Sequence, residues 1–296
     1  MASGIEINRS NITLPADVSA EIIQKTQDES AVMRLARNIQ IPGRGLAIPM
    51  ITSDPEAGWV AETGAKPVDE PGLSTKTMTP YKLAVIVPFS DEFGRDVAAL
   101  YDALVGRLPG ALAKKFDATV FHGSAPGSGF DVLASCTAQS IDVNASTGAG
   151  GFYSALVAAD TDIAAHGGIN NGFAMSPQAR GEMLSALDKD GRPIFINNVA
   201  EGAVERLLGQ QVVYSKGAYK ANVSNRDILG FAGDWTQAIC GTVEGVKIDI
   251  SNQASLTIAS SNVNLWERNM FAVRAEIEVG FVADTDCFNK ITRAKV

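Results

Sequence analysis

The stretch WVAETGAKPVDEPGLSTKTMTPYKLAVIVPFSDE, residues 59–92, sets the architecture of the chain. Its middle part, Glu62 to Gly72, has too few apolar residues for a core of its own, which is typical of the tip of a protruding hairpin. A long return strand is predicted over Thr75–Phe89, after an alternating strand that starts near Leu46. Because a two-stranded hairpin is seldom stable alone, we expect this arm to pack on a partner surface, on this chain or on a neighbour.

Ser90 is the predicted N-cap of a helix, and acidic residues occupy the next two positions, where the helix dipole favours them. From Phe93 to Val120, apolar residues recur at steps of three and four. The pattern predicts one helix over residues 91–122, roughly 48 Å long at about 1.5 Å per residue, with a bend at Pro109. A rod of this length suits a structural scaffold.

Further along the chain, predicted helices and strands alternate. The glycine-rich residues 123–129 are typical of a flexible connector, Phe152–Ala165 is a predicted helix, and Ser176 is the predicted N-cap of another. A tight turn is predicted at Glu244–Gly245, between the predicted strands Ile239–Thr242 and Val246–Ile250. The predicted strands of this region are Phe173–Met175, Val212–Tyr214, Ile228–Ala232, Ile239–Thr242, Val246–Ile250 and the long Val273–Ala283.

The composition is that of a globular chain. With 296 residues, 46% of them hydrophobic and 20% charged, it needs no disulfide or metal to fold. The longest aliphatic run, Leu83–Val87, is far shorter than the roughly 20 apolar residues of a bilayer span, and residues 1–10 lack a signal-peptide core. We therefore expect a soluble intracellular product with no membrane contact. The net charge of -8 and the lack of a basic stripe in the sequence disfavour a nucleic-acid-binding function.

Side chains that could carry chemistry are sparse. Cys136, Cys240 and Cys287 are far apart and odd in number, which favours buried free thiols over a zinc site or a disulfide framework. His122 and His166 each precede a glycine at a predicted helix end, where an imidazole commonly caps the last carbonyls. Because nucleotide-binding and hydrolase motifs are also missing from the sequence, we expect no cofactor, no metal and no enzymatic activity.

Two segments carry a resemblance to a known family. Residues 59–67, WVAETGAKP, and residues 81–92, YKLAVIVPFSDE, resemble the E-loop and the start of the spine helix in the major capsid proteins of tailed bacteriophages, which have the Hong Kong 97-type fold. Further matches are Phe116-Asp117, His122-Gly123, Met175-Ser176-Pro177 and residues 188–195, DKDGRPIF. Because these matches keep the family's order and cover nearly the whole chain, the sequence is identified as a member of this family.

The resemblance implies an α+β fold built from named parts. Residues 1–42 would form an N-arm, residues 43–89 the E-loop β-hairpin, and residues 151–261 an α/β A-domain. The P-domain would comprise residues 90–150, with the long spine helix at 91–122, and residues 262–296, which return as a strand.

The resemblance also implies a function, that of a structural major capsid protein. Such proteins self-assemble as hexamers and pentamers into the icosahedral head that encloses phage double-stranded DNA. The partners would be other copies of the chain, the portal protein, a separate scaffolding protein and a decoration protein where the phage has them, and the packaged DNA without sequence-specific binding. The protein would lie in the virion capsid after assembly in the host cytoplasm.

In a subset of the family, a lysine of the E-loop becomes covalently joined to an asparagine of a neighbouring P-domain, with a glutamate as the base. Lys66, Asn269 and Glu276 match these positions, although the chemistry requires burial that lowers the lysine pKa. The alternative is that Lys66 forms a polar contact across subunits, Asn269 caps a turn, and Glu276 pairs with Arg274 or a neighbour. The residues predicted to make inter-subunit contacts are Trp59, Glu62, Lys66, Arg268, Asn269, Arg274 and Glu276.

Two other functions are weighed against the capsid. An encapsulin-type nanocompartment shell has the same fold, but encapsulins usually start with a short helix, whereas this sequence starts with an extended arm. A soluble α/β enzyme with a pocket within residues 151–261 has little use for a polar hairpin tip, and it would be a small species that does not assemble.

Overall fold

The computed structural model describes residues 30–53, 57–60, 65, 66, 68, 72–91, 106–141, 151–186, 192, 194, 206–223, 225–258 and 261–294. These residues form an α+β fold with two main sheets. In the described part of the chain, the helices are α2 (Ala31–Leu35), α5 (Leu108–His122), α6 (Phe152–Ala165) and α7 (Pro177–Ser185), with short 3-10 helices η1 (Leu133–Ser135), η2 (Lys216–Ala218), η3 (Trp235–Gln237), η4 (Trp266–Arg268) and η5 (Thr285–Cys287). None of the helices described is long and apolar enough to cross a membrane.

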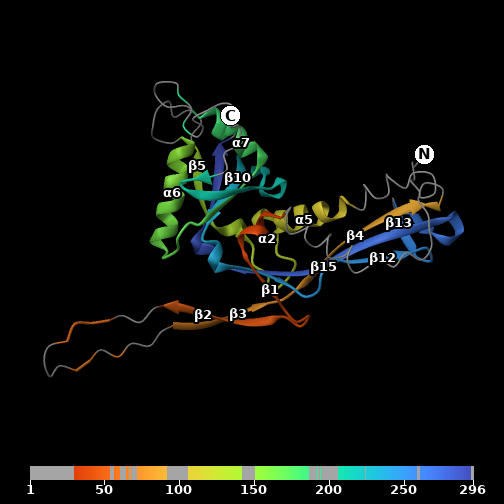
Figure 1. Cartoon of the computed structure of the whole chain (residues 1–296), viewed down its shortest axis with the longest axis horizontal. Helices are drawn as coiled ribbons and strands as arrows, with labels where there is room; N and C mark the ends of the chain where they lie inside the picture. Colours follow the sequence, from red (N-terminus) through yellow and green to blue (C-terminus); the bar gives the residue numbers. More distant parts are fainter. Residues whose placement is uncertain are drawn as a thin grey trace.

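The seven-stranded sheet lies at one end of the molecule, beside α6 and α7 (Figure 1). Its strands run in the order β5-β16-β10-β6-β8-β7, and β9 also pairs with β10. Leu156 and Ile163 of α6 pack with Phe173 and Ile291 of the sheet in one buried cluster, which fixes the helix on the sheet. The strand bounds are β5 (Thr137–Ile141), β6 (Gly172–Met175), β7 (Arg206–Leu207), β8 (Gln210–Tyr214), β9 (Lys220–Val223), β10 (Arg226–Gly233) and β16 (Phe288–Ala294).

The second sheet is built around the long strand β15 (Met270–Ala283). Strand β4 (Tyr81–Ser90) pairs with β15 from Met270 to Val279, and β12 (Lys247–Ser251) pairs with the same region of β15, so it lies on the opposite edge. β11 (Ala238–Thr242) pairs with the end of β15, and β1 (Arg37–Gln40) pairs with β11. Figure 1 shows β4 and β15 extending side by side toward the end of the molecule that lies away from the seven-stranded sheet.

The predicted alternation along β15 is confirmed between Val273 and Val279. Val273, Ala275 and Ile277 are buried, whereas Arg274 and Glu276 between them are partly exposed. Toward Ala283 both faces of the strand are buried, because the strand there packs on one face against the main core and on the other against a smaller cluster that contains Met78. β15 thus contributes to both of these buried clusters.

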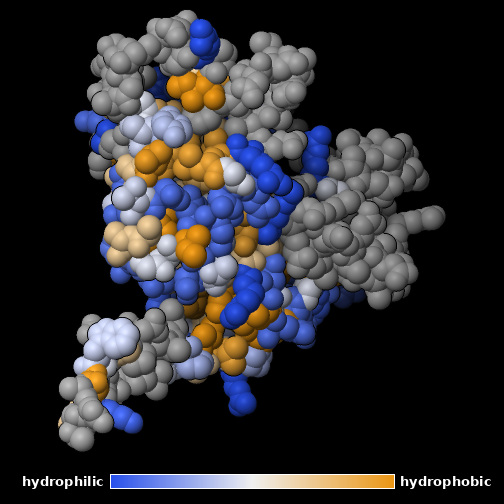
Figure 2. Space-filling model, turned by 60° about the vertical axis from the view of Figure 1, so that its left-hand side comes forward, coloured by the Kyte–Doolittle hydropathy of each residue, from blue (hydrophilic) through white to orange (hydrophobic). Residues whose placement is uncertain are grey.

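A β-hairpin of β2 (Leu46–Ser53) and β3 (Gly72–Met78) projects from the body (Figure 1), and Figure 2 shows it standing away from the rest of the molecule. The prediction of a hairpin is confirmed, but the prediction of one return strand over Thr75–Phe89 is wrong. The strand breaks at Thr79 and Pro80, after which β4 pairs with β15 instead of β2. Proline has no N–H for a strand ladder, and the break lets Met78 enter the core beside Gly241 and Gly280.

The prediction of one continuous helix over residues 91–122 is also wrong. Residues 106 and 107 form a turn, and α5 starts at Leu108 with Pro109 in its first turn. Proline is well placed there because its missing N–H would have no partner inside the helix at that position. Pro109 therefore starts a helix rather than bending one, and residues 92–105 of the predicted rod lie outside the described residues.

The prediction of a tight turn at Glu244–Gly245 is wrong as well. β11 and β12 do not pair with each other but follow one another along β15. Residues 243–246 form a short interruption in this path, where the Val243 N–H donates to Glu278 O. The strands of residues 151–261 are consequently divided between the two sheets, and β5 and β16 from outside that range complete the seven-stranded sheet.

Strands β13 (Ser255–Ile258) and β14 (Ser261–Asn264) form a small separate hairpin next to the start of β15. Val263 and Leu265 are buried against Met270 and Ala272 in a cluster of their own. This cluster fixes the chain at η4, just before β15, where two of the predicted contact residues lie.

Candidate functional site

The outer part of the β2–β3 hairpin carries exposed side chains. Trp59, Lys66 and Val68 are all exposed, and Trp59 is fully accessible to solvent. Glu62, the third predicted contact residue of this hairpin, lies outside the described residues. A fully exposed tryptophan is unusual in a folded chain, because burying such a ring gains far more free energy than leaving it in water. The hairpin therefore presents a surface suited to contact with another molecule.

The hairpin is anchored at its base by polar contacts. Lys76 Nζ of β3 lies 2.8 Å from Asp131 Oδ2 and donates a second bond of 2.7 Å to Ala283 O. The same Asp131 Oδ2 accepts a hydrogen bond of 3.1 Å from the Ala283 N–H at the end of β15. One carboxylate thus ties the hairpin to the end of the central strand, which fixes the direction in which the hairpin projects.

The segment 123–129 supports this anchor and is not the flexible connector predicted from its glycines. Tyr81 Oη donates to Ser128 O at 2.7 Å, and the Thr79 N–H donates to Gly129 O at 2.8 Å. Gly129 has a φ of 74°, and a Cβ there would lie 2.6 Å from Thr79 Oγ1. Glycine at position 129 therefore lets the segment pack closely on the break between β3 and β4. Glycine is needed here for its conformation and small size, and it does not indicate flexibility.

The predicted contact residues of the other surface lie along β15 and just before it. Arg268 and Asn269 are exposed at the end of η4, and Asn269 adopts the left-handed conformation with a φ of 49°. The Asn269 carbonyl accepts a hydrogen bond of 2.9 Å from the Asp91 N–H. The interpretation that Asn269 caps a turn is confirmed, since it is the C-cap of η4 and its N–H donates to Trp266 O.

Arg274 and Glu276 follow on the partly exposed face of β15. Arg274 Nη2 lies 2.6 Å from Asp249 Oδ2 of β12, and Arg274 Nε lies 3.5 Å from Glu276 Oε2. The hydrogen bond that Arg274 donates to Asp249 is the main reason that the pKa of Arg274 is raised. The predicted pairing of Glu276 with Arg274 is confirmed. Glu276, Arg274 and Asp249 thus form a row of ion pairs that extends from β15 to β12.

A single chain does not bring the three candidate cross-linking residues together. Asn269 and Glu276 are separated along β15 by roughly 23 Å at about 3.3 Å per residue. Lys66 lies between β2 and β3 on the hairpin, which projects from a different part of the molecule. If these side chains meet, they must come from different copies of the chain.

A buried junction that the sequence did not single out holds three distant segments together. Asp117 of α5 is completely buried and accepts hydrogen bonds of 2.6 Å from Ser30 Oγ and from Ser215 Oγ. It also accepts bonds from the N–H groups of Ala31 at 2.9 Å and Val32 at 3.3 Å, the first residues of α2. Burial raises the pKa of Asp117, and these hydrogen bonds oppose the rise. The junction joins the start of the described chain, α5 and the loop after β8.

The sequence did contain a signal for this junction. Asp117 stands on the apolar stripe of α5, one residue after the buried Phe116 and three before the buried Val120. A carboxylate at such a position is buried only when several donors surround it.

The three cysteines are buried and form no disulfide. Cys136, Cys240 and Cys287 are free and buried as predicted, and burial raises the pKa of Cys136 and Cys240 to about 12 and that of Cys287 to about 11. Such thiols stay protonated near neutral pH and are poor nucleophiles. Within the described ranges, no group of three His, Cys, Asp or Glu side chains could hold a metal ion.

One of the two histidines has the predicted capping role. His166 Nδ1 lies 2.8 Å from Asp162 O at the end of α6, which confirms the prediction. His122 Nε2 instead lies 2.9 Å from Gly217 O, a carbonyl of η2, so it joins two segments rather than capping its own helix. Burial, assisted by the charge of Lys220, lowers the pKa of His122.

Comparison with known proteins gives consistent matches over almost the full chain. The model of the group described as "Phage capsid family" matches residues 10–291. The "Probable major capsid protein gp17" of Mycobacterium phage D29 is 27% identical over 286 residues, covering 94% of this chain and 89% of that protein.

Solved structures show the same fold at lower identity. A chain of Gordonia phage Cozz superposes with a TM-score of 0.75 at 23% identity, covering 90% of this chain and 87% of that one. A chain of Mycobacterium phage Bobi gives a TM-score of 0.74 at 20% identity, covering 99% of this chain and 96% of that one.

Proposed function

The chain belongs to the phage capsid family, and from this premise we propose that it is a structural major capsid protein that associates with copies of itself to form a phage shell. The observation that carries the proposal is the family match over nearly the whole chain. An encapsulin-type shell is not favoured, because the relatives are named as capsid proteins of phages. The role is structural, and the proposal includes no enzymatic step.

The proposed assembly consists of hexamers and pentamers in an icosahedral head around double-stranded DNA. Residues 1–42 would act as the N-arm, residues 43–89 as the E-loop, and residues 151–261 as the A-domain. Residues 90–150 and 262–296 would form the P-domain. The protein would reside in the virion after assembly in the host cytoplasm, with a portal protein and, where the phage has them, scaffolding and decoration proteins as partners.

The β2–β3 hairpin is the proposed contact between neighbouring copies. Its exposed Trp59 supports this proposal, since a neighbour's surface would remove the ring from water. The anchor of Lys76 on Asp131 supports it as well, because a contact between rigid arms loses less conformational entropy than one between mobile arms. Arg268, Asn269, Arg274 and Glu276 are the proposed receiving residues on the next copy.

A covalent bond between Lys66 and Asn269 of another copy stays a prediction. The bond would form by attack of the neutral Lys66 amine on the Asn269 side-chain carbonyl carbon. Glu276 would take a proton from the attacking nitrogen and pass it to the amide nitrogen of Asn269, which leaves as ammonia as its bond to the carbonyl carbon breaks. Lys66 is exposed in the single chain, so the reaction would require a neighbouring copy to bury it. A denaturing gel of assembled particles tests this, because bonded subunits migrate as multiples of 31.1 kDa.

The assembly itself is tested by sedimentation velocity on the purified chain, alone and with the phage's scaffolding protein. We expect large particles from the wild-type chain and markedly fewer from Trp59→Ser. Ile169→Ser is the matched control, because Ile169 is an exposed apolar residue on the body rather than on the hairpin. A chain that stays monomeric under both conditions would contradict the proposal.

A further inference from the structure

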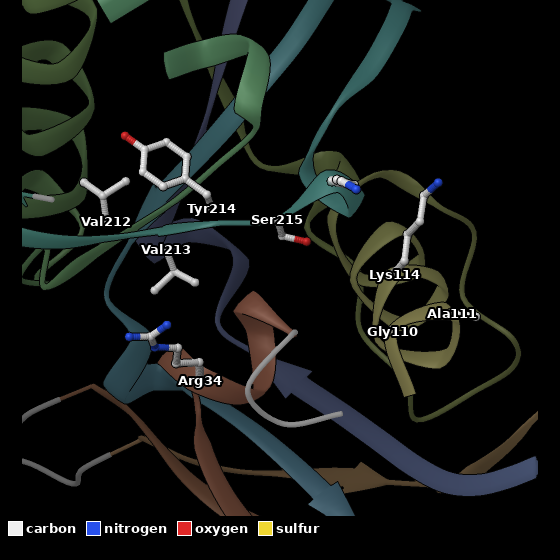
Figure 3. Close-up of a pocket in the computed structure, with 9 residues that line it drawn as sticks. Arg34, Gly110, Ala111, Lys114, Val212, Val213, Tyr214 and Ser215 are labelled. Atoms are coloured by element: carbon white, nitrogen blue, oxygen red, sulfur yellow. The ribbon is translucent and has the colours of Figure 1, made fainter. Parts of the chain in front are cut away.

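A recess of about 660 Å³ lies between α2, α5 and the segment that joins β8 to η2. Figure 3 shows Arg34 on α2 and Lys114 on α5, with Val212 to Tyr214 of β8, and Ser215 after them, on another side. We call it the basic recess. The residues that line it are Arg34, Gly110, Ala111, Lys114, Val212, Val213, Tyr214, Ser215 and Lys216.

Three cations border the basic recess without a balancing charge among the lining residues. Arg34, Lys114 and Lys216 come from three separate elements, and each of them is exposed. In the described part of the chain, no carboxylate forms an ion pair with any of them. Elsewhere, by contrast, Lys76 pairs with Asp131 and Lys82 with Glu278.

The carboxylate nearest in sequence to these cations is withdrawn from them. Asp117 lies three residues after Lys114 on α5, but it is completely buried and engaged by four hydrogen-bond donors. Asp117 therefore holds α2, α5 and the β8–η2 segment in place without presenting its charge at the recess. The fold builds a concentration of positive charge on a chain whose net charge is -8.

The chemistry of this surface suits a polyanion. On α5 the recess is lined by the small residues Gly110 and Ala111 beside Lys114, so Lys114 is the one long side chain that this helix places among the lining residues. Three exposed cations on separate elements can each meet a different phosphate of a polynucleotide, and no base needs to be read. Val212 and Val213 are aliphatic, and the Ser215 hydroxyl already donates to Asp117, so none of these three side chains selects a particular base.

We propose that the basic recess contacts phosphate groups of the DNA that the shell encloses. The proposal rests on the proposed capsid function and deepens it by naming where the shell meets its contents. The contact is independent of sequence and sensitive to salt, because it exchanges DNA counterions for Arg34, Lys114 and Lys216. The sequence showed no basic stripe since these residues are distant along the chain, and only the fold brings them together.

The test is the binding of a fluorescent DNA duplex to the purified full-length chain, measured by anisotropy over a series of KCl concentrations. For three phosphate contacts, we expect log K to fall against log [KCl] with a slope of roughly -3. Lys114→Gln and Lys216→Gln should each weaken binding equally for all duplex sequences and reduce the slope by about 1. Circular dichroism checks that each variant is folded.

Lys115→Gln is the matched control, because Lys115 is the next residue of α5, is also exposed, and lines a different recess with Tyr81 and Phe116. It should leave the slope unchanged. The proposal is overturned if Lys115→Gln has the same effect as Lys114→Gln, or if the chain shows no salt-dependent binding. It is also overturned if poly-glutamate binds the recess more tightly than the duplex, which would identify an acidic peptide as the occupant.

Failure of this inference is distinguishable from failure of the capsid proposal. DNA binding is measured on unassembled chains, whereas assembly is scored by electron microscopy of the same variants. If shells form normally but the unassembled chain does not bind DNA, only the proposal for the basic recess is overturned. Lys114→Gln shells of normal size, formed by subunits with weakened DNA binding, would support it.

Discussion

The hydroxyl of Ser30 donates a hydrogen bond of 2.6 Å to Oδ1 of Asp117, a residue 87 positions further along the chain. Ser30 Oγ also accepts a bond of 3.1 Å from the Met33 N–H, so it is at once the N-cap of α2 and a ligand of the buried carboxylate. The point at which the N-terminal part of the chain joins the body is thus fixed by one side chain of α5.

Replacing Asp117 should loosen this join. Asp117→Ala leaves two hydroxyl and two N–H donors without their acceptor, and we expect it to lower the free energy of unfolding by about 3 kcal/mol. Asp117→Asn keeps the shape and one acceptor oxygen, so its loss should be smaller. Urea unfolding measures both, and Asp160→Ala on the exposed face of α6 is the control. Equal stability of Asp117→Ala and the wild type would contradict the role of the junction.

The anchor of the hairpin can be tested separately from assembly. Lys76→Met removes the bonds to Asp131 and to Ala283 O, and we expect a loss of about 1 kcal/mol. Hydrogen exchange should accelerate in β2 and β3 more than in β15. Lys82→Met, which removes an exposed pair with Glu278, should leave exchange in the hairpin unchanged. Uniform acceleration over the whole chain would show that Lys76 does not orient the hairpin.

Variants of Asn269 separate the role of its backbone conformation from that of its side chain in a bond to Lys66. Its φ of 49° suits Asn or Gly, so Asn269→Gly should be nearly as stable as the wild type. Asn269→Ala should be less stable by about 1 kcal/mol. If covalent multimers appear on denaturing gels, Asn269→Gly and Lys66→Arg should both remove them while shells still form. Multimers that persist in either variant would exclude the Lys66–Asn269 bond.

His122 predicts a pH dependence of stability. Its folded pKa is lowered by burial and by Lys220, so the unfolded chain binds the extra proton first. Its contribution to stability is therefore complete above the unfolded pKa and is lost as pH falls through that value toward the folded pKa. The melting temperature of the wild type relative to His122→Gln should decrease on acidification from pH 8 to pH 5.5. The pKa of Asp117 is raised, so its effect on stability changes with pH in the opposite direction. Because this effect is the same in the wild type and in His122→Gln, it cancels in the difference between their melting temperatures. A constant difference would contradict the prediction.

Local signals in the sequence predicted several elements well. The helix over Phe152–Ala165 has the bounds of α6, and Ser176 caps α7 by accepting from the Ala179 N–H as its position before Pro177 indicates. The alternation of Val273, Ala275 and Ile277 gave the buried face of β15. These features depend on side-chain periodicity and capping, which a short segment contains in full.

Features that depend on distant partners were missed or wrongly predicted. β11 and β12 have the pattern of a hairpin, yet each gains more by pairing with β15, a strand that comes later in the chain. Pro109 has the same sequence signature at the start of a helix as at a bend within one, and the choice depends on residues 106 and 107. The four donors around Asp117 and the three cations of the basic recess come from separate segments, so no local pattern reveals them.

Electron microscopy of the purified chain, with and without the phage's scaffolding protein, shows most directly whether this chain builds a phage shell. We expect closed shells or capsomer rings, in whose reconstruction each β2–β3 hairpin lies across a neighbouring copy with Trp59 covered. Dispersed monomers under both conditions, or shells in which Trp59 remains exposed, would contradict this expectation.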